Sequence, residues 1–281
     1  MKNQYFRFLV FFLLTYYCGW SQGKVTTFTI EVPQLKTSKK IWMYLPHNYE
    51  NSEKKYPVIY MHDAQNLFDA KTSYAGEWKI DETLDSLKAE VIIVGIEHGN
   101  EKRLEELTPY PNKEYGGGNA NAYLDFIVTK LKPHIDSNYR TKTNKMNTAI
   151  GGSSLGGLVS YYAILKYPEI FGKAMIFSPS FWFNEEMYSL TENAKKLKTK
   201  LYFMCGDNES ETMVSDMDLW GERQRWISDA VAVFDTVHHF MYRNTFSMDS
   251  TNFYDAQHFT TEGARKPVPQ DARADQPLSK S

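Results

Sequence analysis

The sequence predicts an α/β fold with a mostly parallel central sheet and helices on both faces of that sheet. Three observations lead to this prediction. Short apolar runs of strand length alternate with stretches that carry apolar residues at helical spacing. Hydrophobic residues make up 42% of the 281 residues and aromatic residues 15%, which is enough for a large core. No Pro/Ser-rich linker divides residues 24–245, so one domain is the simpler account.

Seven segments are expected to form strands. The first two combine β-branched and aromatic residues between Pro and Asn boundaries, which predicts an antiparallel pair in VTTFTIEVP and KKIWMYLPHNY. The next two are short and almost continuously apolar, as buried parallel strands are: YPVIYMHD (56–63) and EVIIVGIEH (90–98). The other three lie in NTAIGG, GKAMIFSPSF and TKLYFMCGD.

Helices are expected between these strands. DETLDSLKA has apolar positions at helical spacing, and GLVSYYAILKYP follows NTAIGG directly. In NAYLDFIVTKLKPHID (121–136), one helix face carries four apolar residues, and Pro133 is expected to end that helix. The four are Tyr123, Phe126, Ile127 and Leu131.

The first 21 residues resemble a signal peptide in their order of features. Lys2 and Arg7 precede the apolar run FLVFFLLTYYCGW, which is short for a membrane span. Gly19 and Ser21 supply the small residues expected before a cleavage site, so we expect the mature chain to start at Gln22. An uncleaved anchor or a buried strand is the alternative. The prediction is a secreted or periplasmic protein with no membrane contact after cleavage.

The remaining chain divides into a domain at residues 22–259 and a tail at residues 260–281. The tail has almost no aliphatic residues and is rich in Pro, Ala, Asp and Lys, which is typical of disorder. After cleavage only Cys205 remains, so no internal disulfide is expected.

The charge balance excludes one class of partner. Lys plus Arg number 32 and Asp plus Glu number 34, which leaves no basic surplus for a nucleic-acid backbone. The expected partner is therefore a small or uncharged molecule. No cofactor and no metal are expected.

The stretch AIGGSSLGGLVSYY (149–162) is the strongest functional motif. It fails as a phosphate loop because no Lys followed by Ser or Thr comes after its second glycine. It fails as a dinucleotide motif because it lies more than halfway along the domain. Gly152, Ser154 and Gly156 instead match Gly-x-Ser-x-Gly between a strand and a helix, with Ser153 at an x position. This pattern predicts a nucleophile elbow whose nucleophile is Ser154.

At this point the chain resembles the Putative esterase family of α/β-hydrolases. That family includes esterase D-type S-formylglutathione hydrolases, feruloyl and acetyl-xylan esterase modules, and trilactone siderophore esterases. The resemblance spans roughly residues 25–217. It rests on YPVIYMHDAQNLFDA, GGSSLGGLVSYYAILKYPEIFGKAMIFSPSFWF and YFMCGDNES. It implies an α/β-hydrolase fold and a serine carboxylic-ester hydrolase.

The resemblance also implies the partners of Ser154. The elbow supplies one oxyanion donor, the backbone N–H of Leu155, and the family pattern places the second at Ala64. The family's Gly-x-x-acid spacing points to Glu209 as the acid, with Asp207 as the alternative. Gln65, Asn66, Trp78 and Trp182 are expected to bind substrate.

The last two residues of the first parallel strand are expected to shape the loop that follows it rather than to react. His62 precedes the loop, and Asp63 is expected to fix it by accepting backbone hydrogen bonds.

The general base is the open position. The family's usual His in a Gly-rich loop is absent, and His239 is the expected base if AVAVFDTV forms the last strand. His238 and His258 remain alternatives.

The resulting hypothesis is a secreted serine esterase that removes acyl groups from a carbohydrate. A siderophore trilactone or small-ester hydrolase is the first alternative. A catalytically dead hydrolase fold that only binds glycans is the second.

Overall fold

The computed structural model describes residues 22–74, 76–194 and 197–204. In these residues a seven-stranded sheet has the order β1-β2-β4-β3-β5-β6-β7. β1 pairs antiparallel with β2, β2 pairs antiparallel with β4, and every later pair is parallel. The predicted mostly parallel sheet and the N-terminal antiparallel pair are confirmed. The strands are β1 (Lys24–Val32), β2 (Thr37–Leu45), β3 (Val58–His62), β4 (Ile92–Ile96), β5 (Thr148–Ser153), β6 (Lys173–Phe177) and β7 (Lys200–Met204).

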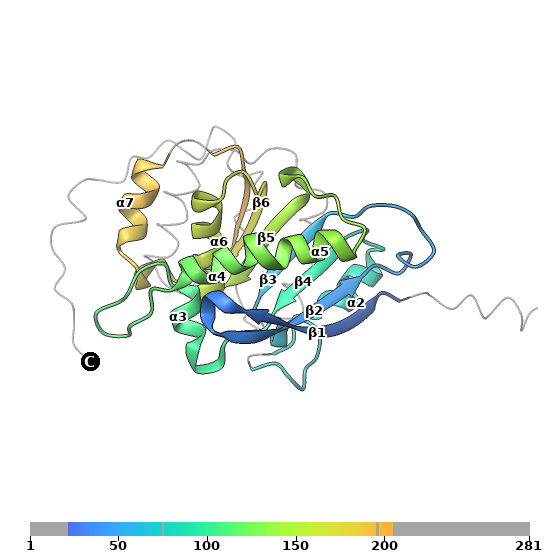
Figure 1. Cartoon of the computed structure of the whole chain (residues 1–281), viewed down its shortest axis with the longest axis horizontal. Coiled ribbons are helices and arrows are strands. Elements are labelled where there is room, and N and C mark those ends of the chain that lie inside the picture. The colour runs from blue at the N-terminus through green and yellow to red at the C-terminus, as the bar shows by residue number, and fades with distance from the viewer. Residues whose placement is uncertain (1–21, 75, 195–196, 205–281) are drawn as a thin grey trace, which may run out of the picture.

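Helices cover both faces of this sheet (Figure 1). One face packs its alternate strand residues, such as Tyr60 and Ile150, against α4, α5 and α6. The opposite face packs Ile59 and Met61 against Ile80, from α2, and neighbouring loop residues. The helices are α2 (Ile80–Ser86), α3 (Arg103–Leu107), α4 (Ala120–Phe126), α5 (Lys132–Asn138), α6 (Leu155–Lys166) and α7 (Glu186–Asn193).

Pro133 does not end the helix in which it lies, so this prediction is wrong. A π-helical segment, η4 (Ile127–Leu131), follows α4, and Pro133 lies in the first turn of α5, which continues to Asn138. The preceding π-helical segment shifts the bonding register, with Lys132 N–H bonded to Ile127 O, and this shift is where the helix accommodates a residue without an N–H. The three segments form one nearly straight rod across the sheet in Figure 1.

The sheet edge at the carboxyl ends of the parallel strands positions the candidate site. Ser153 at the end of β5 pairs with Phe177 of β6, and Phe177 pairs with Met204 of β7. On the other side, Met61 of β3 pairs with Gly151 of β5. In α/β folds this edge is where ligands bind, because the loops after neighbouring strands meet there.

Candidate active site

Ser154 lies in the turn between β5 and α6, within residues 152–156, which we call the elbow. Its backbone has φ 57° and ψ −122°, a region that costs a non-glycine residue about 1–3 kcal/mol. Its N–H donates to Phe177 O at 3.0 Å, and its own carbonyl accepts from Ser180 N–H at 3.2 Å. These bonds hold the strained turn against the end of β6. Ser154 is exposed, whereas Ser153 is half-buried.

The glycines around Ser154 make this turn possible. A Cβ at Gly152 would lie 3.1 Å from the carbonyl carbon of Gly156, across the elbow. A Cβ at Gly157 would lie 3.0 Å from Phe177 O. Both distances are tighter than nearly all real Cβ contacts, so side chains there would push α6 away from the sheet. Gly152 therefore meets the steric condition that the motif predicts, and Gly157, one residue beyond the motif, adds a second close approach.

The two expected oxyanion donors are the first residues of two helical segments. Leu155 begins α6, and Ala64 begins η2, a 3-10 helix at Ala64–Asn66. The N–H of a first helical residue has no acceptor within its own helix. Since β3 and β5 are neighbours, both segments begin at the same edge of the sheet. A shared edge is a necessary condition for two N–H groups to bind one oxyanion.

Ser180 is the described residue whose side chain lies within hydrogen-bond distance of the Ser154 hydroxyl. The two Oγ atoms are 3.1 Å apart, and Ser180 is buried. Sequence reasoning did not select Ser180. Its position after β6, the strand beside β5, is the signal that could have found it.

Asp63 fixes its loop in a different way from the one expected. Its carboxylate accepts two bonds from the Arg103 guanidinium, from Nε to Oδ1 at 2.7 Å and from Nη2 to Oδ2 at 2.8 Å. No backbone N–H of the described residues donates to this carboxylate in the turn it begins. The prediction of backbone donors is therefore wrong, because the carboxylate points to Arg103 and forms a bidentate ion pair with it.

His62 is fully enclosed beneath the elbow. Its Nδ1 lies 2.8 Å from the Tyr123 hydroxyl, and Nε2 is buried without a hydrogen-bond partner in the described residues. A Cβ at Gly152 would lie 3.1 Å from His62 Cδ2, so the ring packs directly against the elbow. Burial lowers the pKa of His62 to about 4, which keeps the ring neutral at physiological pH.

Gln65, Asn66 and Trp78 organise the loop that follows β3. Asn66 Oδ1 accepts from Tyr74 N–H at 3.0 Å, and Asn66 O accepts from Trp78 N–H at 2.8 Å. Gln65 is buried, and Trp78 is 9% exposed and packs edge-on against Phe177. These contacts fix the loop at the edge of the sheet that carries Ser154.

Trp182 differs from these three because it is 59% exposed. It lies in η6 (Phe181–Phe183), directly after Ser180 and Phe181, and its ring packs edge-on against Phe183. Tyr115, which is 53% exposed, contacts the same Phe183 ring. An exposed aromatic surface thus begins two residues from the hydroxyl that contacts Ser154.

The remaining expected site residues lie outside the described residues. They are Asp207, Glu209, His238, His239 and His258. The predicted signal peptide at residues 1–21 and the predicted tail at residues 260–281 lie outside them too. The described chain ends with β7, at the sheet edge that carries Ser154. Asp207 and Glu209 follow that end closely in the sequence.

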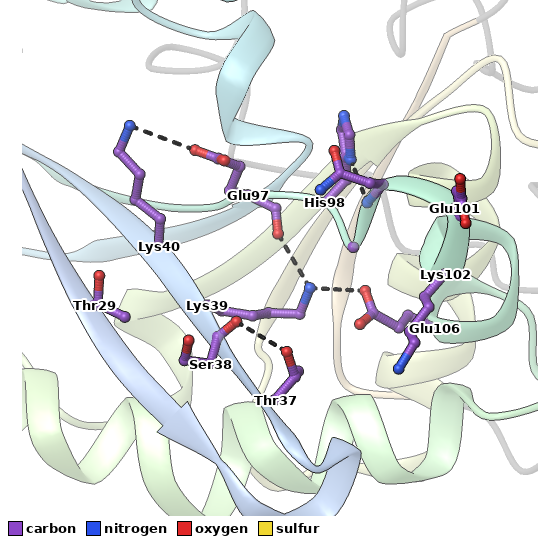
Figure 2. Close-up of a pocket in the computed structure, with 12 residues that line it drawn as sticks. Thr29, Thr37, Ser38, Lys39, Lys40, Glu97, His98, Glu101, Lys102 and Glu106 are labelled. Atoms are coloured by element: carbon purple, nitrogen blue, oxygen red, sulfur yellow. Dashed lines mark hydrogen bonds and ion pairs between the residues drawn. The ribbon is translucent and has the colours of Figure 1, made fainter.

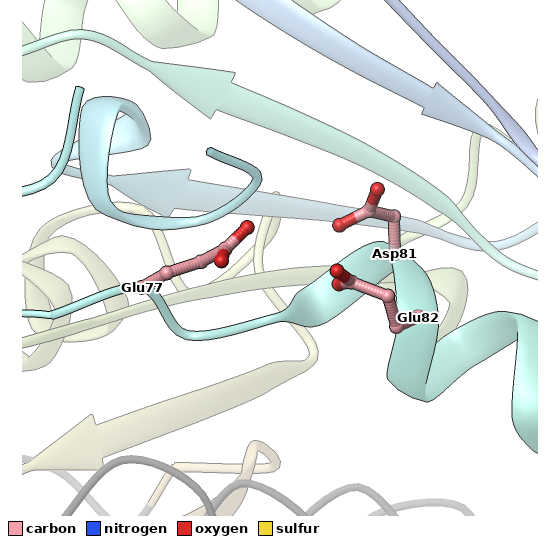
Figure 3. Close-up of side chains that lie close together, drawn as sticks. All are labelled: Glu77, Asp81 and Glu82. Carbon is pink, nitrogen blue, oxygen red and sulfur yellow. The ribbon is translucent and has the colours of Figure 1, made fainter. Parts of the chain in front are cut away.

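One group of carboxylates has the spacing of a metal site. Glu77, Asp81 and Glu82 lie with one oxygen each within 4.8 Å of one another (Figure 3). Glu82 is exposed, and the other two are half-buried. Burial and then the neighbouring Glu82 raise the pKa of Asp81 to about 7. The closeness of the three carboxyl groups thus favours the protonated form of Asp81.

In the described part of the chain, no helix has the length and apolar character of a membrane span.

Comparison with known proteins gives the same family as the sequence motifs. The family model described as "Putative esterase" matches residues 33–242. The Bacillus subtilis protein YbbA, described as uncharacterized, is 30% identical over 61% of this chain and 69% of its own length. A siderophore triacetylfusarinine C esterase of Aspergillus fumigatus is 27% identical over 62% of this chain and 60% of its own. An endo-1,4-beta-xylanase/feruloyl esterase of Xylanibacter ruminicola is 26% identical over 60% of this chain, a match to 22% of that longer protein.

Solved structures share the fold. An IroE-like serine hydrolase from Shewanella oneidensis superimposes with a TM-score of 0.60 at 22% identity, over 79% of each chain. The BES protein from Bacillus cereus superimposes with a TM-score of 0.59 at 22% identity, over 78% of this chain and 94% of its own. The fold is therefore that of the α/β-hydrolase esterases, and the chain belongs to the Putative esterase family.

Proposed function

We propose that this protein is a serine esterase that hydrolyses carboxylic esters, with Ser154 as the nucleophile. The observation that carries the proposal is the backbone of Ser154, strained and exposed between β5 and the first N–H of α6. A protein keeps such strain where it serves a function, and a nucleophile elbow is the use that fits a glycine-flanked serine.

The proposed reaction follows the acyl-transfer scheme of serine hydrolases. Ser154 Oγ attacks the ester carbonyl carbon while His239 takes its proton and Glu209 orients the His239 ring. The N–H groups of Ala64 and Leu155 stabilise the oxyanion. The alcohol leaves with the proton from His239, and water then hydrolyses the acyl-serine by the same route. Asp207 is the alternative acid.

We propose an acyl ester of a carbohydrate as the substrate. Trp182 and Tyr115 support this choice, because both rings are exposed and both pack on Phe183, in the segment that follows Ser180. The relative named as a feruloyl esterase supports it too. Gln65, Asn66 and Trp78 are proposed to form the wall on the β3 side.

A siderophore trilactone ester is the second candidate. The relatives named as siderophore triacetylfusarinine C esterase and ferri-bacillibactin esterase favour it. Comparing acetylated xylan, methyl ferulate and a cyclic trilactone as substrates separates the two candidates.

The proposed location is secreted or periplasmic, with residues 1–21 removed as a signal peptide. The proposed mature protein has the esterase domain at residues 22–259 and the tail at residues 260–281. Sequencing the N-terminus of protein recovered from the envelope or medium would identify Gln22 as the first residue.

The decisive experiment compares Ser154→Ala with Ser153→Ala. Ser154→Ala should lower kcat for p-nitrophenyl acetate on the order of a millionfold, because it removes the nucleophile. Ser153→Ala keeps most activity, since an x residue of the elbow does not react. A fluorophosphonate should label the wild type and the Ser153 variant only. Equal losses in the two variants would rule out Ser154, and a wild type that neither reacts nor labels would favour the glycan-binding alternative.

A further inference from the structure

Asp63 adopts an unusual backbone conformation directly before a proposed oxyanion donor. It is a non-glycine residue in the left-handed region, with φ 57° and ψ 48°, and Ala64 follows it. Left-handed residues other than glycine cost roughly 1–2 kcal/mol. Its carbonyl accepts from Asn66 N–H at 2.9 Å, which closes the turn that starts η2. The direction of the Ala64 N–H therefore depends on this one strained residue.

The Asp63 side chain connects the turn to the elbow. A Cβ at Gly156 would lie 3.5 Å from Asp63 Oδ2 and 3.3 Å from His62 Cβ. The carboxylate thus lies against the first turn of α6, between the two segments that provide the proposed oxyanion donors. It is 9% exposed, so its charge needs a partner.

Arg103 is that partner, and it binds in a fixed geometry. Its two bonds to Asp63, at 2.7 and 2.8 Å, form a planar bidentate contact, which restricts rotation of the carboxylate. The guanidinium comes from the first residue of α3, a segment far from Asp63 in the sequence. It is 29% exposed, so the pair is only partly screened by water.

α3 is itself held by a second, buried ion pair. Glu106, one turn after Arg103, binds Lys39 of β2 at 2.7 Å, and both side chains are 3% exposed. Lys39 Nζ also donates to Glu97 O at 3.2 Å, so it lies between the loop after β4 and α3 (Figure 2). The contacts of Lys39 thus fix α3 on the sheet, and Arg103, its first residue, is held beside Asp63.

We propose that Arg103 is a positioning residue of the esterase site: it holds the Asp63 turn so that the Ala64 N–H points at the oxyanion. The proposal rests on the proposed function. A preorganised donor acts only when its N–H is placed where charge develops, and losing one donor costs about 10²–10³ in kcat. Asp63 accepts from two of the five N–H donors of Arg103, and the role proposed for the guanidinium is to hold this carboxylate rather than to bind substrate.

The test uses the full-length protein and the neutral substrate p-nitrophenyl acetate. Arg103→Gln should lower kcat about 10–100-fold and leave KM within about twofold, because transition-state binding is lost and substrate binding is not. Arg103→Lys keeps the charge and can make one hydrogen bond to Asp63, so it should recover part of kcat. The rate of fluorophosphonate labelling should fall in the same order.

Arg140→Gln is the matched control. Arg140 donates to Tyr49 O and stacks on the Tyr49 ring, near the amino-terminal end of β3 and so away from the elbow. This variant should lower Tm as Arg103→Gln does and keep kcat within about twofold. If Arg103→Gln is not obtained folded, the kcat and KM of Arg103→Lys decide the question.

Three results would overturn the proposal: an unchanged kcat in Arg103→Gln, an equal loss of kcat in Arg140→Gln, or a rise in KM alone. The last would mean that Arg103 contacts substrate. Failure of the proposed function gives a different pattern. In that case the wild type does not label, or Ser154→Ala keeps its activity, and both proposals fall together.

Discussion

At the scale of single residues, Trp78 and Trp182 were both expected to bind substrate, but they differ in burial. Trp78 is 9% exposed and packs edge-on against Phe177. Trp182 is 59% exposed and lies in η6, two residues after Ser180. Trp182 is proposed to use its exposed ring to bind substrate, and this proposal can be tested separately from any role in packing.

Trp182→Ala should therefore raise KM for acylated carbohydrate about 10-fold and leave Tm almost unchanged. The physical reason is that the exposed ring contributes binding surface and little packing. Steady-state kinetics and thermal unfolding measure the two effects. Met146→Ala is the control, since Met146 is 44% exposed just before the amino-terminal end of β5, at the opposite edge of the sheet. A loss of Tm without a change in KM would make Trp182 a structural residue.

The proposed base gives a second prediction for a single residue. His239→Ala should lower kcat at least a thousandfold, as the loss of a triad base does, whereas His258→Ala should have little effect. Rates of p-nitrophenyl acetate hydrolysis by the two purified variants decide it. If truncation before Phe253 abolishes activity and His239→Ala does not, His258 is the base.

At the scale of secondary-structure elements, the Lys39–Glu106 pair fixes α3 on the sheet. Glu106→Gln should destabilise the protein by about 3–5 kcal/mol, because it leaves the Lys39 ammonium buried without its carboxylate. Replacing both, as Lys39→Met with Glu106→Leu, should recover most of that loss. Urea unfolding measures each free energy. Lys54→Met, from the exposed Lys54–Glu90 pair of the same length, is the control and should barely change stability.

The elements also show what can be predicted from the sequence. All seven expected strands form, because apolar runs bounded by turn residues are local signals. The predicted helix end at Pro133 is wrong, since the helix continues through Pro133 to Asn138 after the π-helical segment η4. The turn at Ser154 was predictable from its glycines. The Arg103–Asp63 contact was not, because its partners lie on separate segments and share no pattern in the sequence.

At the scale of the whole molecule, the half-buried Asp81 and the buried His62 make opposite contributions to stability as pH changes. The folded protein protonates Asp81 at about pH 7, against an ordinary value of 3.8, so this group stabilises the fold as pH falls from 7 to 4. His62 has a pKa of about 4 when folded, against 6.5 when unfolded. The unfolded chain therefore takes up that proton first, and His62 destabilises the fold as pH falls from 6.5 to 4.

The two contributions should nearly cancel between pH 6.5 and 4 in the wild type. Asp81→Asn removes the stabilising one, so its free energy of unfolding should fall more steeply with acid than that of the wild type. Urea unfolding at pH 7.5, 6.5, 5.5 and 4.5 measures this slope. Glu101→Gln removes an exposed carboxylate and serves as the control, with a slope like the wild type's. An unchanged slope in Asp81→Asn would mean that Asp81 titrates normally.

The strand order places β3 between β4 and β5, and this has a consequence for how the protein folds. β3 and β5 are separated in the sequence by β4, α3 and the whole α4–α5 rod, so a long loop must close before they pair. The β1–β2 pair closes a far shorter one. A refolding chain should therefore form strands early. The contact between Asp63, after β3, and Gly156, after β5, should form late. Recovery of the Ser154 environment would then report the slowest productive step, which makes covalent labelling of this serine a probe of complete folding.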